Sequence, residues 1–273
     1  MQLEGNVSVK DFIKQLRERA EQVVVGQSEN IEKVVLALLC GGHILLEGVP
    51  GTAKTLLART IARILGVDCK RIQFTPDLMP SDIVGTNVFN LQTSRFEFRA
   101  GPVFTDILIA DEINRTPPKT QAALLEVMEE KTVTIDGVSH ALSPLFTVVA
   151  TQNPIEYEGT YRLPEAQLDR FLLKLSVTYP PPQEEDRILG LYQGRAGLGH
   201  PLDILGAAQA SDGLAALSRT RIQQARQWMA SITVRPEVSN YIGQIVRRTR
   251  EMDQVLMGAS SRAAVHLLQA AKV

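Results

Sequence analysis

The chain has 273 residues, of which 44% are hydrophobic and 22% charged, and its formal net charge is −1. This length allows one large domain or two modest ones with a full core. The nearly neutral charge gives no global field that would draw the chain to nucleic acid or to a membrane, so we expect neither partner. Cys40 and Cys69 are isolated and lack metal-ligand spacing, which indicates thiols of a reducing compartment. With a polar amino terminus and no long apolar run, we expect a cytoplasmic protein.

Two helices are predicted before the first strand. Residues 8–21 form an amphipathic helical pattern, and residues 28–39 form a second one. Between them, residues 23–27 are a short apolar run that ends in a turn.

The stretch that follows reads as a strand, a glycine-rich turn and a helix. An apolar run at residues 44–46 precedes the turn, and apolar residues at helical spacing follow it. This order is the context that a phosphate-binding loop needs, because backbone N–H groups and the positive end of the helix then face one point. Lys54 would reach the outer phosphates and the Thr55 hydroxyl would bind Mg²⁺. The predicted ATP-binding residues of this segment are Gly48, Val49, Pro50, Gly51, Thr52, Ala53, Lys54, Thr55 and Leu56.

Ala53 departs from the strict motif, which has a glycine at this position. Alanine has the smallest Cβ and suits the first turn of a helix, so we expect it to be tolerated with a negative φ. The alternative interpretation is a glycine turn with a chance Lys-Thr pair.

Further strands and two hairpins are predicted downstream. The strands cover residues 71–74, 107–110, 146–151 and 171–177, and one hairpin pairs residues 86–91 with 95–99. A helix begins at Thr116 as its cap, with Pro117 in the first turn. A second hairpin turns at Asp136-Gly137, a dipeptide that favours the type I′ turn.

Alternating strands and helices predict an α/β fold, in which helices cover a parallel sheet. The prolines at 180–182 end this pattern, so we predict a nucleotide-binding domain over residues 1–180. Residues 181–273 read as a small all-helical lid domain, with a glycine-rich loop over residues 194–213 and helical faces near Val238 and Leu268. The last helical pattern reaches the final residue, so we expect the lid to be incomplete.

Asp111 and Glu112 directly follow the buried strand at 107–110. Phosphoryl transfer needs a carboxylate to hold Mg²⁺ and a base to orient water, and these residues suit the two roles in that order. The alternative is a pair of solvated acids at a strand end.

Three further polar residues are candidates for contacts with the nucleotide. Asn153 follows the strand at 146–151, whose tip should lie beside that of the Asp111 strand, so its amide could bind the attacking water or the γ-phosphate. It could equally be a turn residue before Pro154. Arg170 precedes the last strand and could instead pair with Asp169 or Glu165. Arg262 opens the last helix, where it opposes the helix dipole and needs an anionic partner, either a ligand or a surface carboxylate.

Together, residues 48–55, 109–115, 151–154, 163–171 and 258–262 resemble the MoxR family of AAA+ ATPases. The resemblance implies a P-loop fold with a helical lid, the cofactors ATP and Mg²⁺, and alanine as a usual residue at position 53. It also implies that Asp111 holds Mg²⁺, that Glu112 is the catalytic base, and that Asn153, Arg170 and Arg262 are sensor 1, arginine finger and sensor 2. The segment Val25, Gly26 and Gln27 would lie near the adenine.

The same resemblance implies a ring of identical subunits, usually a hexamer, that remodels or activates client proteins. Partners with a von Willebrand A domain are common in such systems. A nucleic-acid translocating motor is the alternative, but the hairpins carry Arg95, Arg99 and His140 without forming a basic cluster. A nucleotide switch with negligible turnover is a third possibility, against which the presence of both Glu112 and Arg170 argues.

Overall fold

The computed structural model describes residues 2–3, 7–155, 159–192, 202 and 214–273. At its centre is a five-stranded sheet in the order β11-β3-β10-β7-β4, in which every neighbouring pair is parallel. This confirms the predicted parallel sheet. The strands are β3 (Ile44–Glu47), β4 (Cys69–Gln73), β7 (Ile107–Asp111), β10 (Thr147–Gln152) and β11 (Leu173–Ser176).

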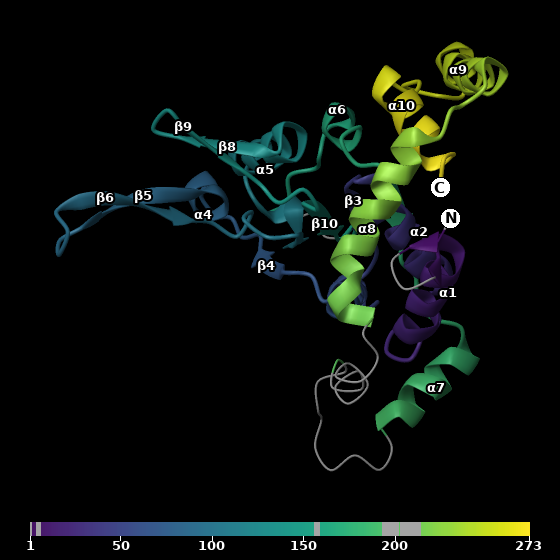
Figure 1. The fold of residues 1–273 in the computed structure, drawn as a ribbon, viewed down its shortest axis with the longest axis horizontal. Helices are drawn as coiled ribbons and strands as arrows, with labels where there is room; N and C mark the ends of the chain where they lie inside the picture. Colours follow the sequence, from purple (N-terminus) through teal and green to yellow (C-terminus); the bar gives the residue numbers. More distant parts are fainter. Residues whose placement is uncertain (1, 4–6, 156–158, 193–201, 203–213) are drawn as a thin grey trace.

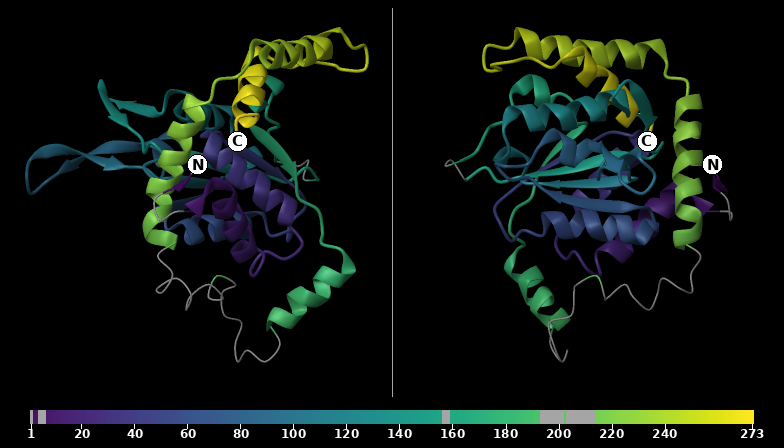
Figure 2. Two further views of the ribbon diagram at one scale, coloured as in Figure 1. Left: turned by 45° about the vertical axis from the view of Figure 1, so that its right-hand side comes forward. Right: turned by 90° about the vertical axis from the view of Figure 1, so that its left-hand side faces the viewer.

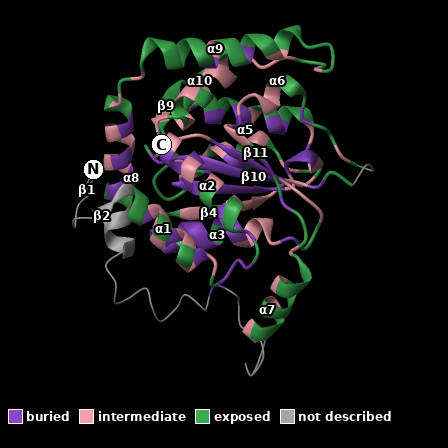
Figure 3. Cartoon of the chain, turned by 90° about the vertical axis from the view of Figure 1, so that its right-hand side faces the viewer, coloured by how far each residue is buried: buried purple, intermediate pink, exposed green. Residues whose placement is uncertain are grey.

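Helices cover both faces of the sheet, which explains why its strands read as continuous apolar runs. Ile44 and Leu46 of β3 point into one hydrophobic cluster, whereas Leu45 points into the other. The first cluster includes side chains of α1 (Val9–Ala20), α2 (Ser28–Cys40) and α3 (Lys54–Leu65). The second includes α5 (Pro118–Glu130) and α4 (Pro80–Val84). Figure 3 shows the buried residues concentrated in the sheet and on the helix faces turned toward it.

Both predicted hairpins are present and project from the same side of the sheet (Figure 1). They are β5 (Gly85–Asn90) with β6 (Arg95–Ala100), and β8 (Thr132–Ile135) with β9 (Val138–Ala141). They contact each other, because Asn87 Nδ2 donates to Asp136 Oδ2 at 2.6 Å and the rings of Phe98 and His140 stack at 4.2 Å. A short pair, β1 (Gln2–Leu3) and β2 (Val7–Ser8), precedes α1.

The predicted start of α5 is wrong by one residue. Pro117, expected in the first turn, is the cap residue with an extended ψ of 153°, and the helix begins at Pro118. A residue before proline is disfavoured in the helical region, so Pro118 keeps Pro117 extended. The short helix η1 (Ile113–Arg115) links β7 to this segment, and α6 (Glu165–Leu168) lies between β10 and β11.

The carboxyl-terminal part is helical among its described residues, with α7 (Pro182–Tyr192), α8 (Leu214–Ser231), α9 (Pro236–Glu251) and α10 (Ser261–Ala270). Although α8 lies in the predicted lid range, it runs along the α/β unit (Figure 2). Its residues Ile222, Ala225 and Met229 belong to the first hydrophobic cluster. Arg226 fixes it further by donating to the carbonyls of Leu38 and Pro144. The domain boundary at residue 180 therefore stays a prediction, and the predicted glycine-rich loop lies outside the described residues except for Leu202.

Within the part of the chain that the structure describes, no helix combines the length and the apolar character that crossing a bilayer requires.

Candidate nucleotide-binding site

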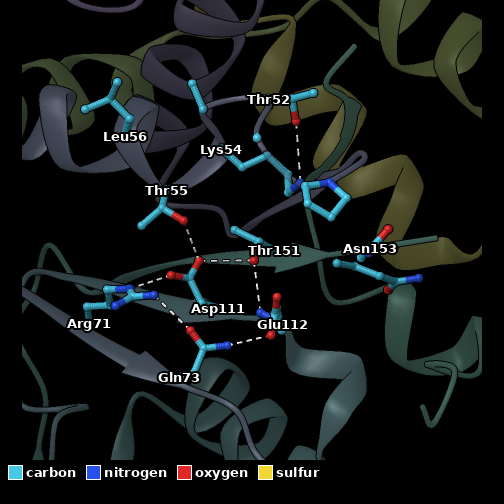
Figure 4. A pocket seen from close by; sticks show the side chains of 14 residues that line it. Thr52, Lys54, Thr55, Leu56, Arg71, Gln73, Asp111, Glu112, Thr151 and Asn153 are labelled. Carbon is cyan, nitrogen blue, oxygen red and sulfur yellow. Dashed lines mark hydrogen bonds and ion pairs between the residues drawn. The ribbon is translucent and has the colours of Figure 1, made fainter. Parts of the chain in front are cut away.

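The predicted phosphate loop connects β3 to α3 and borders a cavity of about 310 Å³ (Figure 4). Gly48 has no room for a side chain, because a Cβ there would lie 2.2 Å from the carbonyl oxygen of Val177. Gly51 has a φ of +81°, which glycine adopts without strain. The loop residues Pro50 to Leu56 line the cavity, whereas Gly48 and Val49 are not among its lining residues and their carbonyls accept hydrogen bonds from Lys54.

The expectation of a negative φ at Ala53 is wrong. Ala53 has a φ of +62° and a ψ of 21°, in the left-handed region, and is the cap residue of α3. For a residue with a Cβ this conformation costs about 1–2 kcal/mol. Such a conformation persists only where the surrounding structure imposes it, so the packing around the loop sets the backbone of Ala53 despite this cost.

Lys54 lies over the loop that bears it. Its Nζ donates to the carbonyl oxygens of Gly48 and Val49, each at 2.7 Å. Partial burial lowers the pKa of Lys54, and the nearby carboxylates Asp111 and Glu112 oppose this shift. A third, longer hydrogen bond joins Nζ to Thr52 Oγ1 at 3.5 Å, so an anionic ligand in the cavity would compete with these loop oxygens for the ammonium.

Asp111 ends β7 and is the buried centre of the site's polar network (Figure 4). Its Oδ1 accepts hydrogen bonds from Thr55 Oγ1 at 2.9 Å and from Thr151 Oγ1 at 3.1 Å. Its Oδ2 accepts from Arg71 Nε at 2.5 Å. The structure therefore brings the two predicted metal-binding residues, Thr55 and Asp111, into contact across 56 positions of sequence.

Glu112 follows directly and also has a left-handed backbone, with a φ of +59°. Its N–H donates to Thr151 Oγ1 at 2.9 Å, which fixes the turn against β10. The carboxylate accepts from Gln73 Nε2 at 2.7 Å and pairs with Arg115 Nε at 3.2 Å. Two donors thus orient the predicted base at the cavity wall.

Asn153 also lines this cavity, as expected from the pairing of β10 with both β3 and β7. Its Oδ1 accepts from the N–H of Ile155 at 3.2 Å, a turn-type hydrogen bond. The two interpretations of Asn153 therefore coexist in one geometry, since the residue shapes the turn and faces the cavity.

The segment at Val25, Gly26 and Gln27 forms a turn, as predicted for the end of the apolar run at residues 23–27. Gly26 and Gln27 line a separate cavity of about 420 Å³ with Lys33, Lys174 and Thr178. Gln27 Nε2 donates to the carbonyl of Thr178 at 3.2 Å, one residue after the Val177 that packs on Gly48. This cavity is thus adjacent to the base of the phosphate loop, on the side away from Asp111.

Arg170 and Arg262 do not line the cavity at the phosphate loop. They meet in a third cavity of about 240 Å³, called here the arginine cavity, where both guanidinium groups pair with Glu129. Arg170 Nη2 lies 2.9 Å from Glu129 Oε2, and Arg262 also lies 3.6 Å from Asp169 Oδ2. The partner of Arg170 is therefore Glu129 and not Asp169 or Glu165, the two carboxylates that the sequence suggested.

His43 closes the floor of the arginine cavity and fixes its position in the fold. Its Nδ1 accepts from the N–H of Val148 at 2.9 Å, so its Nε2–H donates to the carbonyl of Met128 at 3.1 Å. Burial lowers the pKa of His43 to about 4, so the ring is neutral near pH 7. His43 precedes β3 and Gly48 follows it. The two cavities therefore lie at opposite ends of this strand, roughly 16 Å apart at ~3.3 Å per residue.

Sequence reasoning missed Arg71, Gln73, Thr151 and Glu129 as site residues. Arg71 and Gln73 carried a detectable signal, because they alternate on one face of a strand that ends beside Asp111. Glu129 carried none, since it is one of several acids on an exposed helix face.

Comparisons with known proteins agree with this geometry. Residues 43–173 match the family described as the ATPase family associated with various cellular activities (AAA). The chain is 46% identical over 255 residues to the uncharacterized protein YeaC of Bacillus subtilis, covering 93% of this chain and 76% of YeaC. It is 43% identical over 261 residues to the chaperone MoxR1 of Mycobacterium tuberculosis, covering 92% of this chain and 66% of MoxR1.

A crystal structure of a candidate ATPase from Cytophaga hutchinsonii superposes with a TM-score of 0.82 at 39% identity. The superposition covers 96% of this chain and 79% of that one. The chain thus spans about two thirds to three quarters of the length of the two curated relatives named above.

Proposed function

The chain belongs to the MoxR family of AAA ATPases, and we propose that it hydrolyses MgATP in a ring of identical subunits to remodel or activate client proteins. The name of its relative MoxR1, a chaperone, supports the client-directed role. A hexamer, clients or partners with a von Willebrand A domain, and a cytoplasmic location belong to this proposal. The observation that supports a ring is that the arginine cavity lies away from the phosphate loop of the same chain.

The residues at the phosphate loop fit Mg²⁺. Thr55 donates its hydroxyl hydrogen to Asp111, so its oxygen lone pairs are available to a cation. Asp111 contributes a carboxylate, and hydroxyl and carboxylate oxygens are ligands that Mg²⁺ prefers. When bound there, Mg²⁺ would neutralise phosphate charge during transfer.

The chain's own groups have distinct roles in hydrolysis. Lys54 and the N–H groups at the start of α3 bind the phosphates, and Glu112 accepts a proton from the attacking water. Asn153, from the adjacent strand tip, orients the water or the γ-phosphate. The cavity at Gly26 and Gln27 is adjacent to the base of the loop and is the proposed place for the adenine.

Arg170 and Arg262 serve a neighbouring subunit in this proposal. At roughly 16 Å along β3 from their own phosphate loop, their side chains are too far to contact phosphates bound there. Both are partly exposed, and Glu129 holds the two positive charges together. A pair of guanidinium groups presented at the surface suits the phosphates of an adjacent chain.

A mixing experiment tests this arrangement. Arg170→Ala should be inactive alone, since an arginine finger is worth about 10³–10⁵ in rate. Glu112→Gln should be inactive alone because the amide cannot accept the proton of the attacking water. Mixed in equal amounts with subunit exchange, about a quarter of the interfaces in a head-to-tail ring combine an intact Glu112 with an intact Arg170. ATPase activity should therefore reappear.

Arg248→Ala is the matched control, because Arg248 is exposed and pairs with Glu251 on its own helix. It should keep full activity. Mass measurement with nucleotide bound must first establish a ring, and demonstrated exchange without any recovery of activity would contradict the role of Arg170 across the interface.

A further inference from the structure

Arg71 holds the oxygen of Asp111 that the two threonines leave open. Thr55 and Thr151 both donate to Oδ1, whereas Oδ2 accepts from Arg71 Nε. Asp111 is only 4% exposed, and a buried carboxylate needs a compensating positive charge. Arg71 provides that charge from the neighbouring strand β4.

The guanidinium is anchored at a second point. Arg71 Nη2 donates to Gln73 Oε1 at 2.8 Å, and Gln73 Nε2 donates to Glu112 Oε2 at 2.7 Å. One arginine therefore contacts the proposed metal ligand directly and the proposed base through an amide (Figure 4). The half-exposed side chain of Arg71 can leave this position without unpacking the core.

We propose that Arg71 is a positioning residue that competes with Mg²⁺ for Asp111, so that arrival of the metal displaces the arginine. Two cations on one carboxylate repel each other, and Mg²⁺ is the stronger partner of a carboxylate oxygen when phosphates also bind it. Displacement of Arg71 removes the donor that orients the Gln73 amide and thereby loosens its hold on Glu112. This inference rests on the proposed Mg²⁺ site at Thr55 and Asp111.

The test measures binding rather than turnover. Binding of a fluorescent, non-hydrolysable ATP analogue (mant-AMP-PNP) to the full chain is followed while free Mg²⁺ is raised from an EDTA-buffered solution. For Arg71→Gln, the Mg²⁺ concentration at half-maximal effect should fall about three- to ten-fold, because the competitor is gone. Affinity for the metal-free analogue should fall several-fold, because Asp111 then faces the polyphosphate with its charge uncompensated.

Matched variants separate charge from structure. Lys70→Gln removes the same charge from the same strand at an exposed position and should leave the Mg²⁺ midpoint unchanged. Arg71→Lys keeps the charge and should return the midpoint toward that of the parent chain. An unchanged or raised midpoint in Arg71→Gln would overturn the competition.

Asp111→Asn distinguishes failure of this inference from failure of the proposed site. If Mg²⁺ strengthens binding in the parent chain and Asp111→Asn removes that effect, the metal site stands whatever Arg71→Gln does. If Mg²⁺ has no effect in the parent chain, or if its effect survives Asp111→Asn, the metal assignment itself is wrong and the competition is overturned with it.

Discussion

The phosphate-loop cavity and the arginine cavity lie at opposite ends of β3 and differ in how their charges are satisfied. At the phosphate loop, Asp111 is buried and receives three donors from the loop and from neighbouring strands. In the arginine cavity, two partly exposed guanidinium groups share the carboxylate of Glu129. The groups at the phosphate loop are paired with one another, whereas the arginine cavity is lined by three cations, Lys131, Arg170 and Arg262, and one carboxylate, Glu129, and suits an anion supplied from outside.

The two regions share one feature, a residue other than glycine with a positive φ. At the phosphate loop Ala53 and Glu112 have left-handed backbones, and at the arginine cavity Lys131 does, with a φ of +54°. Strain of this kind persists only where surrounding structure imposes it. Packing thus shapes the backbone at both cavities, and the arginine cavity differs in the ion pairs that hold its side chains.

The largest effect is expected at the phosphate loop and tests whether this region binds ATP. Lys54→Ala should weaken ATP binding by more than about 100-fold, because each lost charge-assisted hydrogen bond is worth roughly 1.5–3 kcal/mol. Equilibrium binding of labelled ATP measures this, with Lys14→Ala as a control, because Lys14 is exposed and pairs with Glu18 on its own helix. Micromolar ATP binding by Lys54→Ala would contradict the assignment of this segment as a phosphate-binding loop.

A smaller effect is expected in the arginine cavity. Glu129→Gln should leave ATP affinity unchanged and lower turnover in the assembled ring by about ten-fold, because Arg170 and Arg262 then repel each other and lose their fixed orientation. Glu130→Gln, one residue along the same helix and also exposed, is the control. Equal turnover for the two variants at saturating ATP would show that Glu129 does not position the arginines.

The smallest effect concerns strain at the loop. Ala53→Gly should raise the free energy of unfolding by about 0.5–1 kcal/mol, because glycine removes the cost of the left-handed conformation but adds freedom to the unfolded chain. Ala122→Gly, at an exposed position inside α5, should have the opposite sign and lower stability by about 1 kcal/mol. Chemical denaturation measures both, and a loss of stability in Ala53→Gly would contradict the strain.

The sequence by itself determined the order of strand, loop and helix, the parallel sheet, both hairpins and the position of Asp111 at a strand end. These features follow from local patterns, since apolar periodicity sets the elements and parallel strands bring their carboxyl ends to one edge. The Arg71–Asp111 contact was within reach of the same logic, because alternation on β4 places Arg71 and Gln73 on one face.

Only the tertiary structure decided the backbone of Ala53, the packing of α8 on the α/β unit, and the partners of Arg170 and Arg262. The position of a charged residue in the sequence does not indicate which residue it pairs with. Glu129 lies 41 residues before Arg170 and 133 before Arg262. Only the packing of α5 and α10 near the start of β3 brings the three side chains together. Ala53 was misjudged for a similar reason. A helix start normally favours negative φ, but the direction in which the chain leaves β3 is set by the sheet and overrides that local preference.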